Sequence, residues 1–325
     1  MFAARRLLSE ALRERIVGDG LISRLSTIGA QWLANRRHTV ITLIGPTGTG
    51  KTAVARALSE ALKRVALGMG AGSRPVIPSV VVDLQELSEG SAWWGRSLAD
   101  EVLALYQEAG SDLTLAEAGA VIVLDGMDSM AFRRRTGSGR EFTRSKQTSV
   151  LPVLSGANVP FSSQGSEHAR DSFSCAHSLV IMTARLDSLE PEPPPATPPA
   201  PIDIQRQGYS PELVSRLGTL MVMPALTDGE QRELLAQLLA RESDAWKDWG
   251  YLLKVSKQAV GLVSSLLQGQ RLGLAIPSAA ALLQTAAREK LEELVAEDAA
   301  EGTEWLLTPD AVRLPDVKTK PGWRG

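Results

Sequence analysis

Residues 39–52 read TVITLIGPTGTGKT, and this stretch decides the fold. Its first six residues are β-branched or apolar, which is typical of a strand buried on both faces. The next eight match the pattern G-x-x-x-x-G-K-[ST], and a run with helical periodicity continues to residue 66. Strand, glycine-rich turn and helix in this order indicate a loop whose backbone N–H groups surround phosphate oxygens.

The loop residues have separate roles in this chemistry. The glycines let the backbone curve round phosphates, Lys51 reaches the β- and γ-phosphates, and Thr52 offers its hydroxyl to Mg²⁺. We therefore expect ATP and Mg²⁺ as ligands, the alternative being a glycine-rich turn that binds nothing. The residues expected to bind the nucleotide here are Gly45, Pro46, Thr47, Gly48, Thr49, Gly50, Lys51 and Thr52.

The surrounding chain alternates apolar runs with helical stretches, which favours an α/β fold with a parallel five-stranded sheet covered by helices on both faces. This large αβα domain is predicted over 1–224, followed by a smaller all-helical domain over 225–308 and a tail over 309–325. The predicted strands are residues 39–45, 79–84, 120–125, 178–184 and 220–226.

Composition excludes several classes of protein. Of 325 residues, 44% are hydrophobic, and the formal net charge of -2 is no signature of a nucleic-acid binder. The single cysteine, Cys175, excludes an internal disulfide framework, and we expect it to be a small buried or loop residue. No apolar run approaches the roughly 18 residues of a membrane span. We expect a cytoplasmic protein with no membrane partner.

The strand predicted over 120–125 ends in Asp125, which we expect to hold Mg²⁺ through water beside Thr52. Many ATPases of this kind carry a glutamate next, which polarises the attacking water, but this chain has Gly126. General-base assistance is worth roughly 10²–10⁴ in rate. The sequence therefore predicts slow hydrolysis unless Asp128 or another group substitutes.

Together these motifs resemble the AAA+ ATPases of the Clp unfoldase group, its ClpX branch in particular, from about residue 12 to 290. The resemblance implies that Ile16 and Val17, in RIVGD, cover the adenine. It also places GSAWWGRSLADEV (90–102) as a pore loop that grips polypeptide. The residues expected to grip are Trp93, Trp94 and Gly95.

Two arginines gain a role from the same resemblance. GYSPELVSRLG (208–218) is similar to the box that carries the arginine finger, here Arg216, although a solvated or salt-bridged arginine is the alternative. QGQRLGL (268–274) resembles sensor 2 and suggests that Arg271 reaches the γ-phosphate. Sensor 1 lacks its usual asparagine, so Thr183 or Arg185 stands in.

Two further segments remain open. EPEPPPATPPAPID (190–203) predicts an extended surface loop. It occupies the place of the apolar tripeptide that docks on the ClpP-type peptidase, and no zinc domain precedes the ATPase module, so we do not expect that peptidase as a partner. AFRRRTGSGREFTRSK (131–146) is a second pore loop, a nucleic-acid patch or a solvated loop. Its basic residues are Arg133, Arg134, Arg135, Arg140, Arg144 and Lys146.

The resemblance implies a ring, a hexamer, that binds Mg-ATP between subunits and uses it to remodel or unfold a protein substrate. The alternative is a hydrolysis-deficient, ATP-bound switch or structural subunit, in a ring of its own or in a mixed ring with a paralogue. The glycine that follows Asp125 is what keeps this alternative open.

Overall fold

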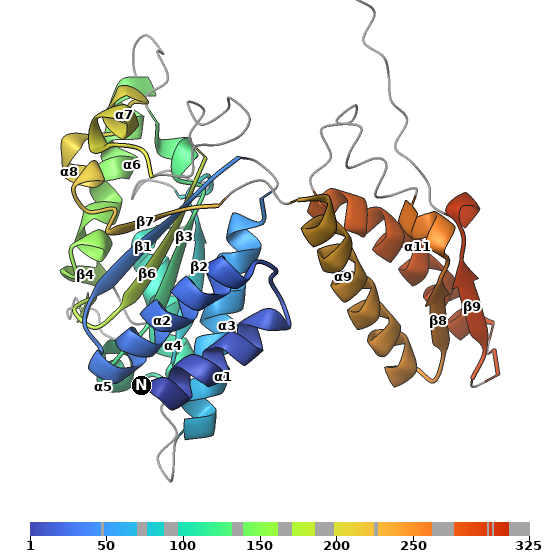
Figure 1. Cartoon of the computed structure of the whole chain (residues 1–325). Coiled ribbons are helices and arrows are strands. Elements are labelled where there is room, and N and C mark those ends of the chain that lie inside the picture. Colours follow the sequence, from blue (N-terminus) through green and yellow to red (C-terminus); the bar gives the residue numbers. More distant parts are fainter. Residues whose placement is uncertain are drawn as a thin grey trace, which may run out of the picture. The chain divides into compact units, whose positions relative to one another are not determined.

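The computed structural model describes most of the chain (Figure 1). The chain divides into two compact units: the first comprises Met1–Thr47 and Lys51–Ala225, and the second comprises Leu226–Gly325 together with Gly48–Gly50. The described residues are 1–46, 49–69, 77–87, 97–131, 139–161, 171–185, 198–223, 227–261, 276–297, 299–300 and 302–311.

A parallel five-stranded sheet in the order β2-β3-β6-β1-β7 forms the centre of the first unit. The predicted α/β fold is confirmed, since each predicted strand overlaps an observed one. The strand next to the phosphate loop, β1, lies between β6 and β7. The bounds are β1 Thr39–Ile44, β2 Ser79–Asp83, β3 Val121–Asp125, β6 Leu179–Ala184 and β7 Thr219–Val222.

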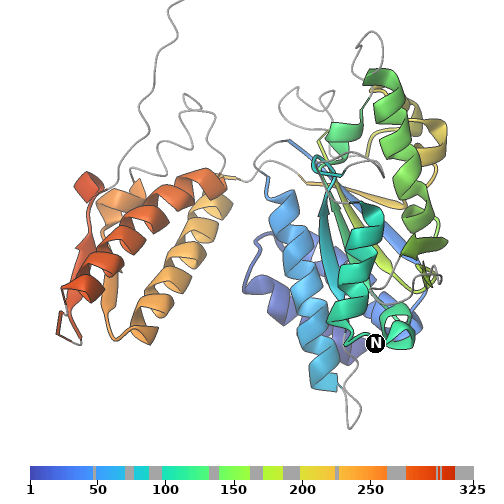
Figure 2. The same ribbon diagram turned by 180° about the vertical axis from the view of Figure 1, so that it is seen from behind.

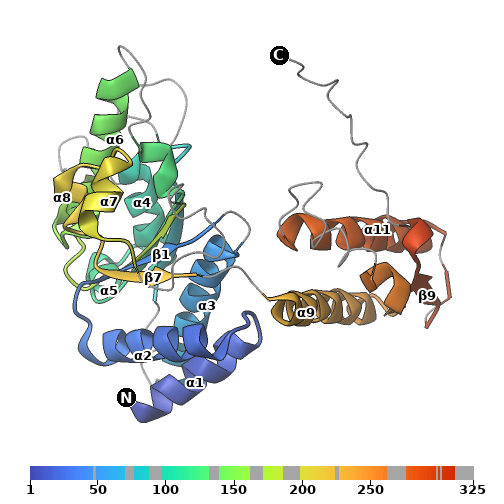
Figure 3. The ribbon, with the colours of Figure 1, turned by 45° about the horizontal axis from the view of Figure 1, so that its top comes forward.

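Helices cover both faces of this sheet, and each face has its own core (Figure 3). Val121 and Val123 pack with α1 (Phe2–Arg13), α2 (Asp19–Asn35) and α3 (Lys51–Met69). Ile122 and Leu124, the alternate residues of the same strand, belong to the core on the other face. Each such buried side chain contributes roughly 1.5–3 kcal/mol of transfer free energy, which explains why the strands are apolar at nearly every position.

The second face is covered by elements that include α4 (Leu98–Glu108) and α6 (Gly139–Leu154), seen from behind in Figure 2. Ser97 begins α4 with a capping box in which its hydroxyl accepts from the Asp100 N–H. The remaining short elements of this unit are α5 (Leu113–Glu117), the 3₁₀ helix η1 (Met127–Met130), α7 (Pro201–Arg206) and α8 (Pro211–Val214).

Two local features of the first unit differ from the sequence analysis. An antiparallel pair of short strands, β4 (Asn158–Phe161) and β5 (Asp171–Ser174), was not predicted. The extended conformation predicted over 190–203 is wrong at its end. There α7 begins with Pro201 at its first position, where the missing N–H is not needed for the helix. Residues 186–197 lie outside the described part of the chain.

The second unit has two long helices, α9 (Asp228–Asp248) and α11 (Ile276–Ala296). Thr227 and Glu230 form the capping box that begins α9. Trp246 and Trp305 stack with ring centroids 5.7 Å apart in its core. The unit is not all-helical, because β8 (Leu252–Val255) pairs in parallel with β9 (Glu304–Leu307) before the short helix η3 (Pro309–Ala311).

No helix among the described residues combines the length and the apolar character that crossing a bilayer requires.

Candidate nucleotide-binding site

The candidate site lies where three parallel strands end. Because β1, β3 and β6 run in the same direction, their carboxyl ends meet at one edge of the sheet. The phosphate loop follows β1 and leads into α3, whose first two residues are Lys51 and Thr52. Asp125 ends β3, and Thr183 is the residue before the last of β6. Four side chains from three segments that are distant in sequence are thus brought to one edge.

Three of these side chains form a hydrogen-bonded cluster. The Thr52 hydroxyl donates to both oxygens of Asp125, at 2.8 Å and 3.0 Å. The Thr183 hydroxyl donates to the first of these oxygens at 2.5 Å and accepts from the N–H of Gly126 at 3.0 Å. Asp125 is therefore held from two sides. Hydroxyl and carboxylate oxygens are ligands that Mg²⁺ accepts, so Thr52 and Asp125 fit the expected cation.

Lys51 points back onto the loop that precedes it. Its ammonium donates to the carbonyl oxygens of Gly45 at 2.9 Å and Pro46 at 2.7 Å. The pKa of Lys51 lies below its ordinary value, mainly because the ammonium is buried. The negative charge of Asp128 raises this pKa, the positive charge of Arg185 lowers it, and the negative charge of Asp125 raises it, in decreasing order of size. The ammonium thus lies within the field of both acidic residues that the sequence nominated.

The backbone conformation at position 126 explains why the residue there is a glycine. Its φ of 83° and ψ of 47° are left-handed, and it precedes the 3₁₀ helix η1. Ser129 donates to the Gly126 carbonyl from its N–H at 3.0 Å and from its hydroxyl at 2.9 Å. A Cβ here would meet only Gln85, at 3.8 Å and 3.9 Å. A glutamate would therefore have room, but its backbone strain costs roughly 1–2 kcal/mol.

Asp128 lies on η1, one turn beyond this glycine. One of its oxygens accepts a hydrogen bond from the N–H of Arg185, which follows β6, at 3.4 Å. The carboxylate is partly buried and has the largest influence of any charge on Lys51. Among the described residues, Asp128 and Asp125 are therefore the two acidic groups whose charges act on Lys51.

Arg216 lies at the opposite edge of the sheet. It follows α8 and precedes β7, whose first residue, Thr219, pairs with Ile41, the third residue of β1. Its partner Ser155 directly precedes Gly156, which lies against His38 just before β1. Its guanidinium donates to the Ser155 hydroxyl and to the Glu212 carbonyl, both at 2.6 Å. The six residues of β1 put about 17 Å between its ends, at about 3.3 Å per residue. The fold thus keeps Arg216 away from its own Asp125.

The other nominated residues divide into two groups. Ile16 and Val17 are buried, and Ile16 packs in the core with α1, α2 and α3, so their contact with adenine stays a prediction. Thr49 is buried and Gly50 has a φ of 78°. Outside the described residues lie Thr47, Gly48, Trp93, Trp94, Gly95 and Arg271.

Two residues of α6 have roles that the sequence analysis did not assign. Lys146, assigned to a basic surface stretch, is 6% exposed and donates to the carbonyls of Leu84 and Gln85, each at 3.2 Å. The stretch is therefore not one solvated loop, since its last part is helical. Gln147 is also buried and was missed, because a glutamine between a lysine and a threonine gives no apolar pattern.

Comparisons with known proteins agree with this geometry. Residues 41–194 match the model of the family AAA, ATPase family associated with various cellular activities. The chain is 29% identical over 127 residues to the ATP-dependent Clp protease ATP-binding subunit ClpX of Borrelia duttonii (strain Ly), covering 37% of this chain and 25% of the relative.

A second relative is the protein of the same name from Porphyromonas gingivalis (strain ATCC BAA-308 / W83), 28% identical over 159 residues. The match covers 46% of this chain and 34% of that relative. The chain thus spans between a quarter and about a third of the length of these curated relatives.

Proposed function

We propose that this chain, an AAA+ protein similar to ClpX, binds Mg-ATP and hydrolyses it at an interface between copies of itself. One observation supports this most. Lys51, Thr52 and Asp125 lie at the carboxyl edge of the sheet, whereas Arg216 lies at the amino edge. A single subunit therefore has both a phosphate site and an arginine, but its arginine is too far away to act on a nucleotide in its own site.

The residues at the carboxyl edge have separate roles in the proposed site. Thr52 and Asp125 would hold Mg²⁺, which supplies charge that neutralises the phosphate oxygens. Lys51 would exchange its two carbonyl partners for phosphate oxygens. Thr183 keeps the Asp125 carboxylate oriented through its short hydrogen bond. Asp128, beside Lys51, is the proposed acceptor for the proton of the attacking water, in place of the glutamate that Gly126 replaces.

The position of Arg216 favours a cyclic assembly. If each subunit inserts its arginine into the next subunit's site, the contact is heterologous, and such contacts form a ring when the rotation between subunits closes and an open helical filament when it does not. A trans arginine stabilises the charge on the transferred phosphoryl group. We propose a ring of this kind, a hexamer, that uses the cycle to remodel or unfold a protein substrate in the cytoplasm. The tryptophans at 93 and 94 are the proposed grip on that substrate, by their place in the sequence.

A steady-state ATPase assay with Lys51→Ala as the control tests the proposal. We expect turnover that requires Mg²⁺ and Lys51, and a mass in ATP that is a multiple of the monomer mass. If turnover is absent, or is unchanged in Lys51→Ala, the enzymatic proposal is wrong.

Gly126 supports a second candidate, an ATP-bound switch or structural subunit that does not hydrolyse its ligand. In that case ATP promotes assembly without turnover, and Gly126→Glu creates activity, whereas Gly126→Ala, which bears the same backbone strain without a carboxylate, does not. Rapid Lys51-dependent turnover by the natural protein would exclude this candidate.

A further inference from the structure

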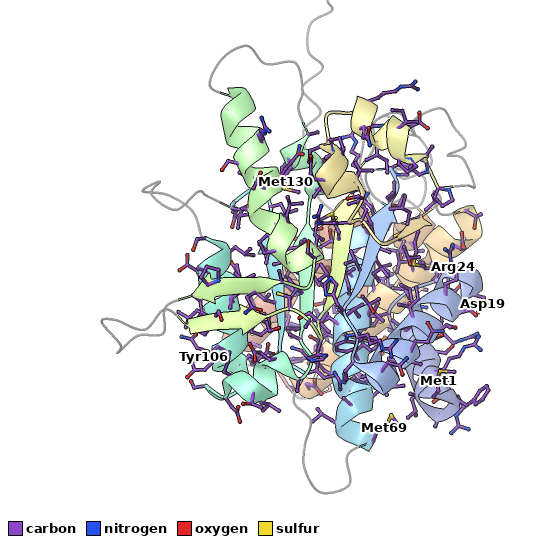
Figure 4. The ribbon with its side chains drawn as sticks, turned by 90° about the vertical axis from the view of Figure 1, so that its left-hand side faces the viewer. Met1, Asp19, Arg24, Met69, Tyr106 and Met130 are labelled. Carbon is purple, nitrogen blue, oxygen red and sulfur yellow. The ribbon has the colours of Figure 1, made fainter. Side chains whose placement is uncertain are left out.

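Gln147 is a buried amide whose three hydrogen bonds join two separate parts of the first unit. It lies on α6 and is 1% exposed. Its amide nitrogen donates to the carbonyls of Met130, at 2.6 Å, and Gly208, at 3.0 Å. Its amide oxygen accepts from the N–H of Ser210 at 2.8 Å. Both amide hydrogens and the oxygen are therefore used, and Figure 4 shows Met130 beside α6.

One side of this connection belongs to the nucleotide end. Met130 is the last residue of η1, the short helix that begins after Gly126 and contains Asp128. Asp125 directly precedes that glycine. A change in the position of either carboxylate on binding Mg-ATP therefore displaces the same short helix whose last carbonyl Gln147 holds.

The other side belongs to the arginine. Ser210 begins α8, and its hydroxyl accepts from the N–H of Leu213 at 3.2 Å. Arg216 lies directly beyond that helix, with its Nη1 bonded to the carbonyl of Glu212. The segment that Gln147 anchors at Gly208 and Ser210 thus supplies one of the two acceptors that hold the guanidinium, the other being the Ser155 hydroxyl just beyond the end of α6.

We propose that Gln147 is a positioning residue that transmits the state of one subunit's nucleotide site to the arginine which that subunit offers to its neighbour. The inference rests on the proposed function. Separating η1 from α8 would leave buried polar groups without partners, which is costly. The two elements therefore move together, and the arginine reaches its full effect only when the subunit that carries it has bound nucleotide.

The test compares Gln147→Met, which keeps the length of the side chain and removes all three hydrogen bonds, with Gln147→Glu, which keeps only the acceptor for Ser210. Val150→Ala is the matched control, since Val150 is fully buried on the same helix and makes no such bonds. Turnover, ATP affinity and melting temperature are measured for each variant, alone and combined with Arg216→Ala.

We expect Gln147→Met to lower kcat by about tenfold, within the range usual for coupling between sites, while the Kd for ATP changes little. Gln147→Glu should behave similarly. When Arg216→Ala is also present, Gln147→Met should have no further effect on kcat, because the arginine through which Gln147 acts is gone. Val150→Ala should lower the melting temperature but not kcat.

Two results would overturn the inference alone: an equal loss of kcat in the Arg216→Ala background, or the same loss in a Val150→Ala variant of equal melting temperature. If the natural protein shows no Lys51-dependent turnover, the proposed function is wrong. The role of Gln147 is then tested by amide hydrogen exchange, which needs no turnover. A non-hydrolysable ATP analogue should then slow exchange at residues 208–217 in the natural protein but not in Gln147→Met. Equal slowing in both contradicts the coupling.

Discussion

Replacing Arg216 by alanine should remove hydrolysis without unfolding the protein. The guanidinium bonds Ser155 and Glu212 at a partly exposed position, so the loss of stability should be about 1 kcal/mol or less. A trans arginine contributes roughly 10³–10⁵ to kcat. The expected variant therefore melts within about 4 °C of the natural protein, binds ATP and has almost no turnover.

Mixing two inactive variants tests whether the arginine acts on a neighbour. Arg216→Ala has an intact phosphate site, and Lys51→Ala has an intact arginine, so a Lys51→Ala subunit can complete the site of an Arg216→Ala neighbour. In a random equal mixture about one interface in four combines them in the productive order, so at most about a quarter of natural turnover should return, and less where the Lys51→Ala subunit that supplies the arginine has no bound nucleotide. The assay is phosphate release from each variant and from the mixture.

Arg206→Ala is the matched control, since Arg206 is an exposed arginine on α7 that bonds Asp203 and is not proposed to act on nucleotide. It should keep natural turnover. Two inactive variants whose mixture stays inactive, although mass measurements show mixed assemblies, would refute the trans assignment. So would an Arg216→Ala variant with natural kcat.

Three further predictions concern stability and reactivity. Thr183→Val removes the hydrogen bond to the Asp125 carboxylate and leaves the N–H of Gly126 without its acceptor, which should lower the free energy of unfolding by roughly 2–4 kcal/mol. Thr42→Val, which removes one buried bond to a neutral carbonyl at 2.7 Å, should cost less in the same denaturation experiment, and an equal cost would contradict this reasoning. Gly218→Ala should destabilise strongly, by roughly 3 kcal/mol or more, because its φ is 61° and a Cβ would overlap a backbone oxygen of β1; a natural melting temperature would rule this out. Burial raises the pKa of the Cys175 thiol to about 12, so at pH 8 it stays protonated and should resist a disulfide reagent until the protein unfolds; rapid labelling of the native protein would disagree.

The sequence predicted the sheet and the helix that follows β1 because their signals are local, and it predicts the phosphate-binding role of the turn between them. Each strand is a short apolar run, and the loop requires its glycines, Lys51 and Thr52 in a fixed order. The second unit was predicted less well. The four-residue strands β8 and β9 contain one buried side chain each, too few to stand out beside two long helices.

The sequence pattern does not reveal which residues that are distant in the chain come together in the fold. Nothing in GYSPELVSRLG indicates that Arg216 lies at the far edge of the sheet, because that depends on β7 running parallel to β1. Lys146 was expected at the surface, where most lysines lie, yet its ammonium is bonded to two carbonyls that follow β2. A polar residue in a helix shows its role only when the elements around it are placed.

The bonds from Lys51 to Gly45 and Pro46 bear on which ligands the loop accepts. An incoming molecule has to replace two acceptors that the lysine already has, so binding is an exchange of partners, and the free energy gained is a difference between two sets of hydrogen bonds. A di- or triphosphate offers several charged oxygens at once and strengthens the bonds that replace the carbonyls. A single weakly charged acceptor offers too little in return. We therefore expect the loop to bind a di- or triphosphate in preference to a small anion, whatever base or sugar the ligand carries.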